Sequence, residues 1–535
     1  MIAAILLLGI AGLAFALSFA AAGSAAQRAR VTERALAQAR EALMAYAVDR
    51  AISAEVGPGY LPCPDLDDDG WAESTCGSMN GDSGQAQRLG RLPWKTLGLP
   101  DLRDGDGERL WYAVSSKYKG LLNCAASRAC VDMSPDSALG TISVRDRSGM
   151  LIHDGTIAEP YRANDGGALA VVFAPGAPLT RLNADGSASF EQRRDCAPGD
   201  CDLLGRCATE PPQRAARCDP RNYLDNAPAA GFAGEDNADF VDRNDAAGRV
   251  RNTNGFIHGP VVLADGRLAV NDRLAAISYR DLMPRIMARV ALEVARCLRD
   301  YAARAENGGR YPWPAPVCAQ ATPDPSAAWR GEAGALFGRI PDTPFTEAAT
   351  RGMLDRWWRA TAHTPEDFAG LPTRDQACHV AIAPDDAGAT RTTAVPAPAD
   401  EGETAGHSGN AWWTPWKPFV FFAVARAYAP AAAPPAGCGD PTQCIDLADL
   451  SGTVIAHGKQ FAVLVAGAPL VRDGVLQSHA GAAIGDAGQW LEESNARLAS
   501  ASSCVVGTPC STQACNRVVS AGAVHGFNDV AIAFP

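Results

Sequence analysis

LWYAV, residues 110–114, returns in the second half of the chain as VFFAV, residues 420–424. Both runs are apolar and rich in aromatic or β-branched residues, which predicts a buried β-strand. Each run leads through a tyrosine to two cysteines that lie six positions apart. The recurrence of one strand with the same sequel predicts that the chain holds two copies of one unit.

Further stretches recur in the same order on both sides of a border near residue 280. The matching pairs are GRLP (90–93) with GRIP (338–341), VRDRSGMLIH (144–153) with LADLSGTVIA (447–456), VVFAPGAPL (171–179) with VLVAGAPL (463–470), YLD (223–225) with WLE (490–492), and ND (271–272) with ND (528–529). Chance is a poor explanation for so many matches in one order.

Each copy opens with a helical pattern. In the first copy, Leu36, Ala39, Leu43 and Ala47 recur at three- and four-residue steps between polar residues. This spacing predicts an amphipathic helix with one buried stripe. Short apolar runs bounded by Gly, Pro or Asp follow and predict strands. These runs lie near residues 110–115, 141–152, 168–174, 419–425, 453–456 and 461–466.

We therefore predict an α+β fold in three parts. A long N-terminal membrane and amphipathic helix spans residues 1–50, a first globular unit spans 51–280, and a second, diverged unit spans 281–535. In each unit a helix packs on a small antiparallel sheet, and long loops are stapled by disulfides. At 535 residues the chain is too long for one ordinary core, which agrees with two units.

Cysteine usage predicts an exported protein. The chain has 16 cysteines and no Cys-x-x-Cys pair, so structural disulfides are favoured over metal or redox sites. We expect Cys124 to bond Cys130 and Cys438 to bond Cys444; Cys63 and Cys76 are further disulfide candidates. The net charge of −12, with no block dense in Lys and Arg, argues against nucleic acid as a partner.

The N-terminus predicts a membrane anchor. Residues 2–22 carry no charge and are long enough, at about 1.5 Å per residue, to cross a hydrocarbon layer of about 30 Å. A cleaved signal peptide is the alternative, because residues 20–26 are small. We expect an inner-membrane anchor with the globular body in the periplasm or outside the cell, although Arg28, Arg30 and Arg34 follow the apolar run.

The first copy resembles the type IV pilins and the pseudopilins of type II secretion. The resemblance rests on ALAQAREALMAYAV (35–48), LPCPD (61–65), GRLPWKTLGL (90–99) and LWYAV (110–114), and it covers roughly residues 1–280. It implies a pilin-like fold for each unit and other pilin-like or secretion-apparatus subunits as partners. The chain begins MIAAI, without the glutamate of the usual prepilin signature, so the resemblance implies an accessory role rather than a major subunit.

An acidic loop supplies the candidate metal site. Asp65, Asp67 and Asp69 alternate before Gly70, as in the first half of a calcium loop, and Glu73 could serve as a further ligand. An ordinary solvated turn is the alternative reading. A second acidic loop, with Asp101, Asp104, Asp106 and Glu108, is a weaker calcium candidate.

The sequence contains no catalytic signature that we recognise. It has no His-Glu-x-x-His pair and no glycine-rich phosphate loop. We therefore expect a non-enzymatic, pilin-like or pseudopilin-like structural or accessory subunit of an extracellular fibre or secretion apparatus. The alternative is an exported hydrolase or carbohydrate-binding protein whose site is built from dispersed residues.

Overall fold

The computed structural model shows two compact units, which we describe separately. Unit 1 comprises Met1–Tyr46, Tyr60–Cys130 and Leu139–Tyr279, and unit 2 comprises Ala47–Gly59, Val131–Ala138 and Arg280–Pro535. The structure describes residues 2–49 (side chains from 24), 58–74, 76, 88–115, 118, 133–137, 140–156, 166–194, 219–232, 235–240, 242–244, 250–252, 255–303, 307–315, 317, 334–341, 413–430, 437–438, 443–472, 474–479, 485–492, 495–496, 498, 517–520 and 527–535.

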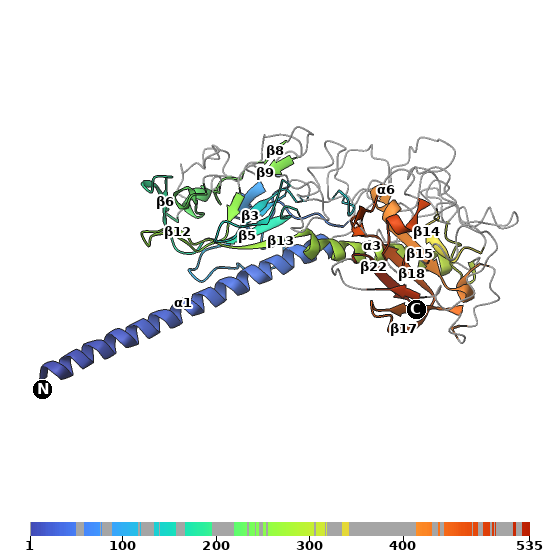
Figure 1. Cartoon of the computed structure of the whole chain (residues 1–535), viewed down its shortest axis with the longest axis horizontal. Coiled ribbons are helices and arrows are strands. Elements are labelled where there is room, and N and C mark those ends of the chain that lie inside the picture. The colour runs from blue at the N-terminus through green and yellow to red at the C-terminus, as the bar shows by residue number, and fades with distance from the viewer. Residues whose placement is uncertain are drawn as a thin grey trace. The chain divides into compact units, whose positions relative to one another are not determined.

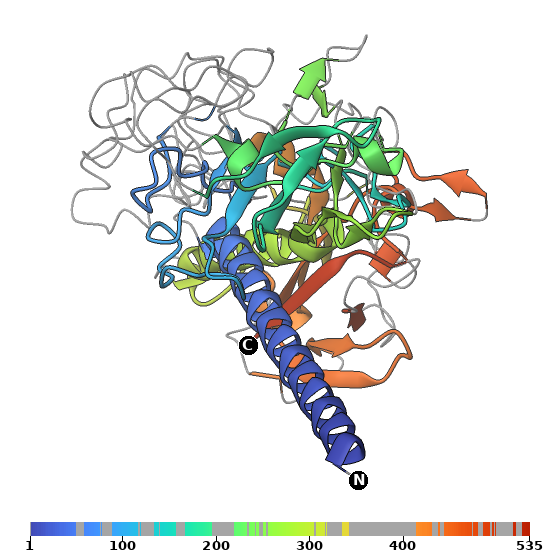
Figure 2. The same cartoon turned by 90° about the vertical axis from the view of Figure 1, so that its left-hand side faces the viewer.

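Helix α1 (Ile2–Asp49) runs without interruption through the predicted anchor and amphipathic regions (Figure 1, Figure 2). Its buried stripe is the predicted one and includes Leu36, Ala39, Leu43 and Ala47. The predicted membrane span, residues 2–22, lies where the side chains of α1 fall outside the described residues. Among the residues that are described, no helix has both the length and the apolar character needed to cross a membrane.

The core of unit 1 is a four-stranded antiparallel sheet. In order across the sheet, its strands are β1 (Leu89–Arg91), β2 (Trp111–Val114), β5 (Ala170–Ala174) and β13 (Arg273–Ile277). Every residue of β5 is buried, as expected for a continuous apolar strand in mid-sheet. The guanidinium of Arg40 in α1 donates to the Ala276 carbonyl at 3.0 Å, which fixes the helix beside β13 (Figure 1).

A smaller sheet covers the core of unit 1. Its strands, in order, are β10 (Gly255–Ile257), β3 (Ser143–Arg145) and β4 (Leu151–His153). β10 pairs with β3 in parallel, so this sheet is mixed rather than antiparallel as predicted. The described residues of unit 1 also form three two-stranded ribbons: β6 (Thr180–Leu182) with β7 (Ala188–Glu191), β8 (Asp242–Asn244) with β9 (Val250–Asn252), and β11 (Val261–Val262) with β12 (Leu268–Val270).

Unit 2 repeats this topology. Helix α3 (Tyr279–Ala303) precedes a four-stranded antiparallel sheet in the order β14 (Phe337–Arg339), β15 (Val420–Val424), β18 (Phe461–Val465), β22 (Val530–Phe534). The smaller sheet has the order β21 (Arg517–Val519), β16 (Ile445–Ala448), β17 (Val454–Lys459), again with one parallel pair. A ribbon of β19 (Val471–Arg472) and β20 (Val475–Leu476) and the short helix α6 (Trp413–Trp416) are also present.

The fold is thus mixed α+β with small sheets, as predicted. Strand order, pairing direction and chain order agree between the two units for both sheets. The repeated sequence stretches therefore occupy equivalent places: LWYAV and VFFAV contain β2 and β15, the second strands of their sheets.

Candidate functional site

The acidic loop brings three of its four predicted metal ligands together. One carboxylate oxygen from each of Asp65, Asp67 and Asp69 lies within 4.8 Å of the others. Asp65 is buried, and its oxygens accept the backbone N–H groups of Asp69 at 3.2 Å and Gly70 at 2.8 Å. Burial raises the pKa of Asp65 to about 7, and the neighbouring carboxylates add to the rise.

The fourth predicted ligand, Glu73, is not part of that group of carboxylates. Its Oε1 accepts the backbone N–H of Leu66 at 3.3 Å. The turn itself depends on Gly70, which has a φ of +89° and faces the Trp94 ring so closely that a Cβ there would lie 2.7 Å from the indole nitrogen. A larger residue at this position would disturb the loop.

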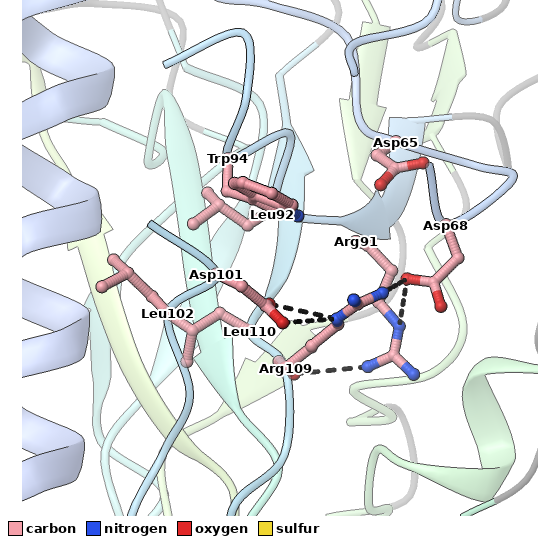
Figure 3. Close-up of a pocket in the computed structure, with 9 residues that line it drawn as sticks. All are labelled: Asp65, Asp68, Arg91, Leu92, Trp94, Asp101, Leu102, Arg109 and Leu110. Atoms are coloured by element: carbon pink, nitrogen blue, oxygen red, sulfur yellow. Dashed lines mark hydrogen bonds and ion pairs between the residues drawn. The ribbon is translucent and has the colours of Figure 1, made fainter. Parts of the chain in front are cut away.

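Asp68, which lies between Asp67 and Asp69 in the sequence, is not one of the three converging carboxylates. It lines a small charged pocket instead (Figure 3). Its Oδ1 lies 2.8 Å from Arg109 and 3.8 Å from Arg91, and Arg109 also contacts Asp101 at 3.0 Å. The pocket has a volume of about 10 Å³, which is room for about one water molecule. This pocket is too small for an organic substrate, and its charges largely satisfy one another.

The second acidic loop makes hydrogen bonds that stabilise the fold. Asp104 is buried and accepts the backbone N–H groups of Asp106 and Glu108, each at 2.9 Å, and of Gly176 at 2.7 Å. The hydroxyl of Thr32 in α1 accepts the N–H of Gly105 at 2.9 Å. The loop therefore joins α1, through Thr32, to the turn after β5, through Asp104.

Two of the candidate disulfides are present. Cys63 bonds Cys76 and so closes the acidic loop, and Cys438 bonds Cys444 as predicted, each with a Cα separation of 5.6 Å. Cys124 and Cys130 lie outside the described residues. Cys297 in α3 is also disulfide-bonded.

The surface of α1 changes along its length. Every residue from Ser24 to Val31 is exposed, and the first buried side chain is Thr32. From there to Ala47 one face is buried in the body while Glu33, Ala37 and Ala45 stay exposed on the other. One continuous helix thus extends beyond the surface that supports it, which makes its exposed part a candidate surface for membrane or partner contact.

A buried arginine that was not predicted from the sequence recurs in both units. The Arg91 guanidinium lies 4.5 Å from the ring centre of Trp111 and 4.1 Å from that of Tyr223. The Arg339 guanidinium lies 3.8 Å from Phe421 and 4.7 Å from Trp490. The repeated GRLP and GRIP stretches marked these residues, but their sequence spacing gave no hint of the aromatic partners.

A histidine with a carboxylate partner was also missed. His479 in unit 2 holds its Nδ1 at 3.0 Å from both Asp136 carboxylate oxygens and stacks on Trp490 at 4.1 Å. Only 3% of its side chain is exposed. A substrate cannot reach a ring in this position, so we assign this pair a structural role.

Comparisons with protein families, with curated proteins and with solved structures find no match to this chain.

Proposed function

We propose that this chain is a non-enzymatic, pilin-like or pseudopilin-like structural or accessory subunit of an extracellular fibre or secretion apparatus. In this proposal the N-terminal part of α1 holds the protein in the inner membrane, and the two units lie in the periplasm or outside the cell. Each unit would be a diverged copy of a pilin-like fold, with the helix packed on a four-stranded sheet.

The observation that carries the proposal is the burial pattern of α1. Isolated helices are only marginally stable in water, and a helix usually gains its stability from packing. Yet α1 continues as a helix through the exposed residues 24–31, where Arg28 contacts Asp106, and on to Ile2. A bilayer or the helices of other subunits would supply the missing environment for the apolar residues 2–22.

The alternative, an exported hydrolase or carbohydrate-binding protein, receives less support. The pocket beside Arg91 has room for about one water molecule, and the His479 ring is buried. Neither offers a place where substrate could meet a reactive side chain.

The proposal is tested by fractionation and cross-linking of the full-length protein in its native host. We expect the protein to stay with membranes after alkaline washing, and a photoreactive residue at Ala29 to form adducts with other subunits. The same residue at Ala45, which is exposed beside the packed part of α1, serves as the matched control. Recovery of a soluble protein with its N-terminus near residues 23–27 would contradict the anchor.

We also propose that the acidic loop binds calcium through Asp65, Asp67 and Asp69. The three converging carboxylate oxygens favour a hard cation, and the Cys63–Cys76 disulfide constrains the loop. Because the pKa of Asp65 is raised to about 7, a bound cation must displace its proton, so calcium affinity should increase between pH 6 and pH 8.

Thermal unfolding with added calcium tests this second proposal. At a concentration of 100 times Kd, calcium should stabilise unit 1 by about 2.7 kcal/mol. The double variant Asp67→Asn/Asp69→Asn should lose this effect, while Asp106→Asn in the other acidic loop should retain it. An unchanged melting temperature of the wild-type protein in millimolar calcium would rule the site out.

A further inference from the structure

A pair of buried carboxyl side chains stands at the start of the last strand of each four-stranded sheet. Unit 1 pairs Asp225 with Asp272, which precedes β13, and unit 2 pairs Glu492 with Asp529, which precedes β22. The relative exposure of all four residues is 0%. These are the YLD/WLE and ND/ND matches of the sequence, so the repeat preserved both members of each pair.

In unit 1 the two carboxyl groups interlock with backbone. The Asp225 N–H donates to Asp272 Oδ2 at 2.8 Å, and the Asn271 N–H donates to Asp225 Oδ2 at 2.7 Å. The amide groups of Asn237 and Gln192 donate to Asp272 and Asp225 at 2.8 and 2.9 Å. The turn at residues 223–225 is therefore attached to the start of β13.

Unit 2 builds the same joint although Glu492 is one methylene longer than Asp225. The Glu492 N–H donates to Asp529 Oδ2 at 3.0 Å, and the Asp529 N–H donates back to Glu492 Oε2 at 3.1 Å. Asn495 takes the place of Asn237 and donates to Asp529 at 3.4 Å. An arrangement retained through a change of side-chain length indicates that the pairing of the two carboxyl groups itself matters.

Some oxygens of these pairs have no donor. Within the described part of the chain, Asp272 Oδ1, Asp529 Oδ1 and Glu492 Oε1 are buried and accept no hydrogen bond. Leaving an ionised carboxylate oxygen in that state is costly, whereas a neutral carboxyl group tolerates it better and adds an O–H donor.

Nearby cations are engaged elsewhere. In unit 1, Arg181 pairs with Asp236, and Arg194 donates to the carbonyls of Tyr223 and Gly176. In unit 2, Arg472 donates to the Leu491 carbonyl at 3.3 Å. These guanidinium groups weaken the repulsion within each pair without neutralising either carboxylate directly.

We propose that each carboxyl pair retains one proton at neutral pH, and that these two protons hold the last strands β13 and β22 of the four-stranded sheets in their units. Loss of the proton would place two negative charges side by side in a buried joint, so each of these strands would loosen as the pH rises.

The electrostatics agree with this arrangement. Burial raises the pKa of Asp272 and of Asp529 well above the ordinary value, and the partner carboxylate raises it further. Burial also raises the pKa of Asp225 and Glu492. Because the folded state holds protons that the unfolded chain releases near pH 4, this stabilisation is complete below about pH 4 and is lost as pH rises through the folded-state pKa.

Chemical denaturation of the full-length protein between pH 5 and pH 8.5 tests the proposal, with hydrogen exchange in β13 and β22 reporting on each unit. In the window where a pair keeps its proton, the unfolding equilibrium constant should rise about tenfold per pH unit for each proton. Asp272→Asn should reduce the pH dependence in unit 1 alone by about one proton and leave the part due to Asp65, whose pKa is also raised. Asp529→Asn should reduce it in unit 2 alone, because an amide donates without ionising.

Asp219→Asn is the matched control. Asp219 is buried like the paired residues but forms an ion pair with Arg221, so this variant should be less stable at every pH and keep the wild-type pH dependence. Should Asp272→Asn fail to fold, Asp225→Asn removes the same pair. Infrared spectra at neutral pH should show a protonated carboxyl band in the wild-type protein that weakens in each pair variant. A pH-independent wild type, unchanged pH dependence in the variants, or absence of the band would each overturn the proposal.

Discussion

Asp104 shows how a carboxylate in an acidic loop can serve the fold instead of a ligand. Its two oxygens accept three backbone N–H groups, and only 3% of the residue is exposed. Asp106, two residues on, forms a longer contact of 3.5 Å with Arg28 and is one-third exposed. We therefore expect these two aspartates to contribute very differently to stability.

We predict that Asp104→Ala lowers the free energy of unfolding by about 3 kcal/mol, because buried donors lose a charged acceptor. Asp106→Ala should change it by less than about 0.5 kcal/mol, as for other exposed ion pairs. Guanidinium unfolding of the full-length variants measures both values. An effect of Asp104→Ala as small as that predicted for Asp106→Ala would show that the joint between this loop and the turn after β5 is unimportant.

Sequence spacing predicted part of the acidic sites, for a definite reason. Alternation before Gly70 was sufficient to bring Asp65, Asp67 and Asp69 together, because such a turn is local. The structural role of Asp104 could not be predicted from the sequence, because one of its hydrogen-bond donors, Gly176, is 72 positions away. Glu73, predicted as a possible further ligand, accepts the Leu66 N–H through Oε1 and lies outside the converging group.

Among the elements, α1 was the most predictable. The three- and four-residue spacing identified its buried face, and Leu43 is 0% exposed while Ala45 is exposed. Strands β2, β5, β15 and β18 also lie where continuous apolar runs predicted them. The short strands β10 and β21 carry no comparable signal, because each has three residues and is stabilised by a parallel partner far away in sequence.

We predict that Leu43→Asp unfolds unit 1, because it places an unpaired charge against the sheet. Hydrogen exchange should lose protection in β2 and β5, whereas β15 and β18, in unit 2, should remain protected. Ala45→Asp introduces the same charge on the exposed face of the same helix and should leave both units protected. Full protection of β5 in Leu43→Asp would mean that α1 does not support the sheet.

At the scale of the molecule, the sequence repeat predicted the organisation better than any single motif. Matches such as GRLP with GRIP placed β1 and β14 at equivalent edges, next to β2 and β15. The chemistry inside the repeat could not be predicted in the same way. The carboxyl pairs join residues 47 and 37 positions apart, and only the folded chain brings them together.

The last strands of the two four-stranded sheets have a consequence for how the chain is made. β13 and β22 each pair with a strand made much earlier, so β5 and β18 present an open edge until their partners arrive. Open edges are templates for wrong pairing, and two units of one topology offer each other nearly interchangeable edges. Synthesis from the N-terminus separates them in time, because β13 is complete before β14, β15, β18 and β22 exist. The order in which the strands are synthesised thus protects each unit from pairing with the last strand of the other.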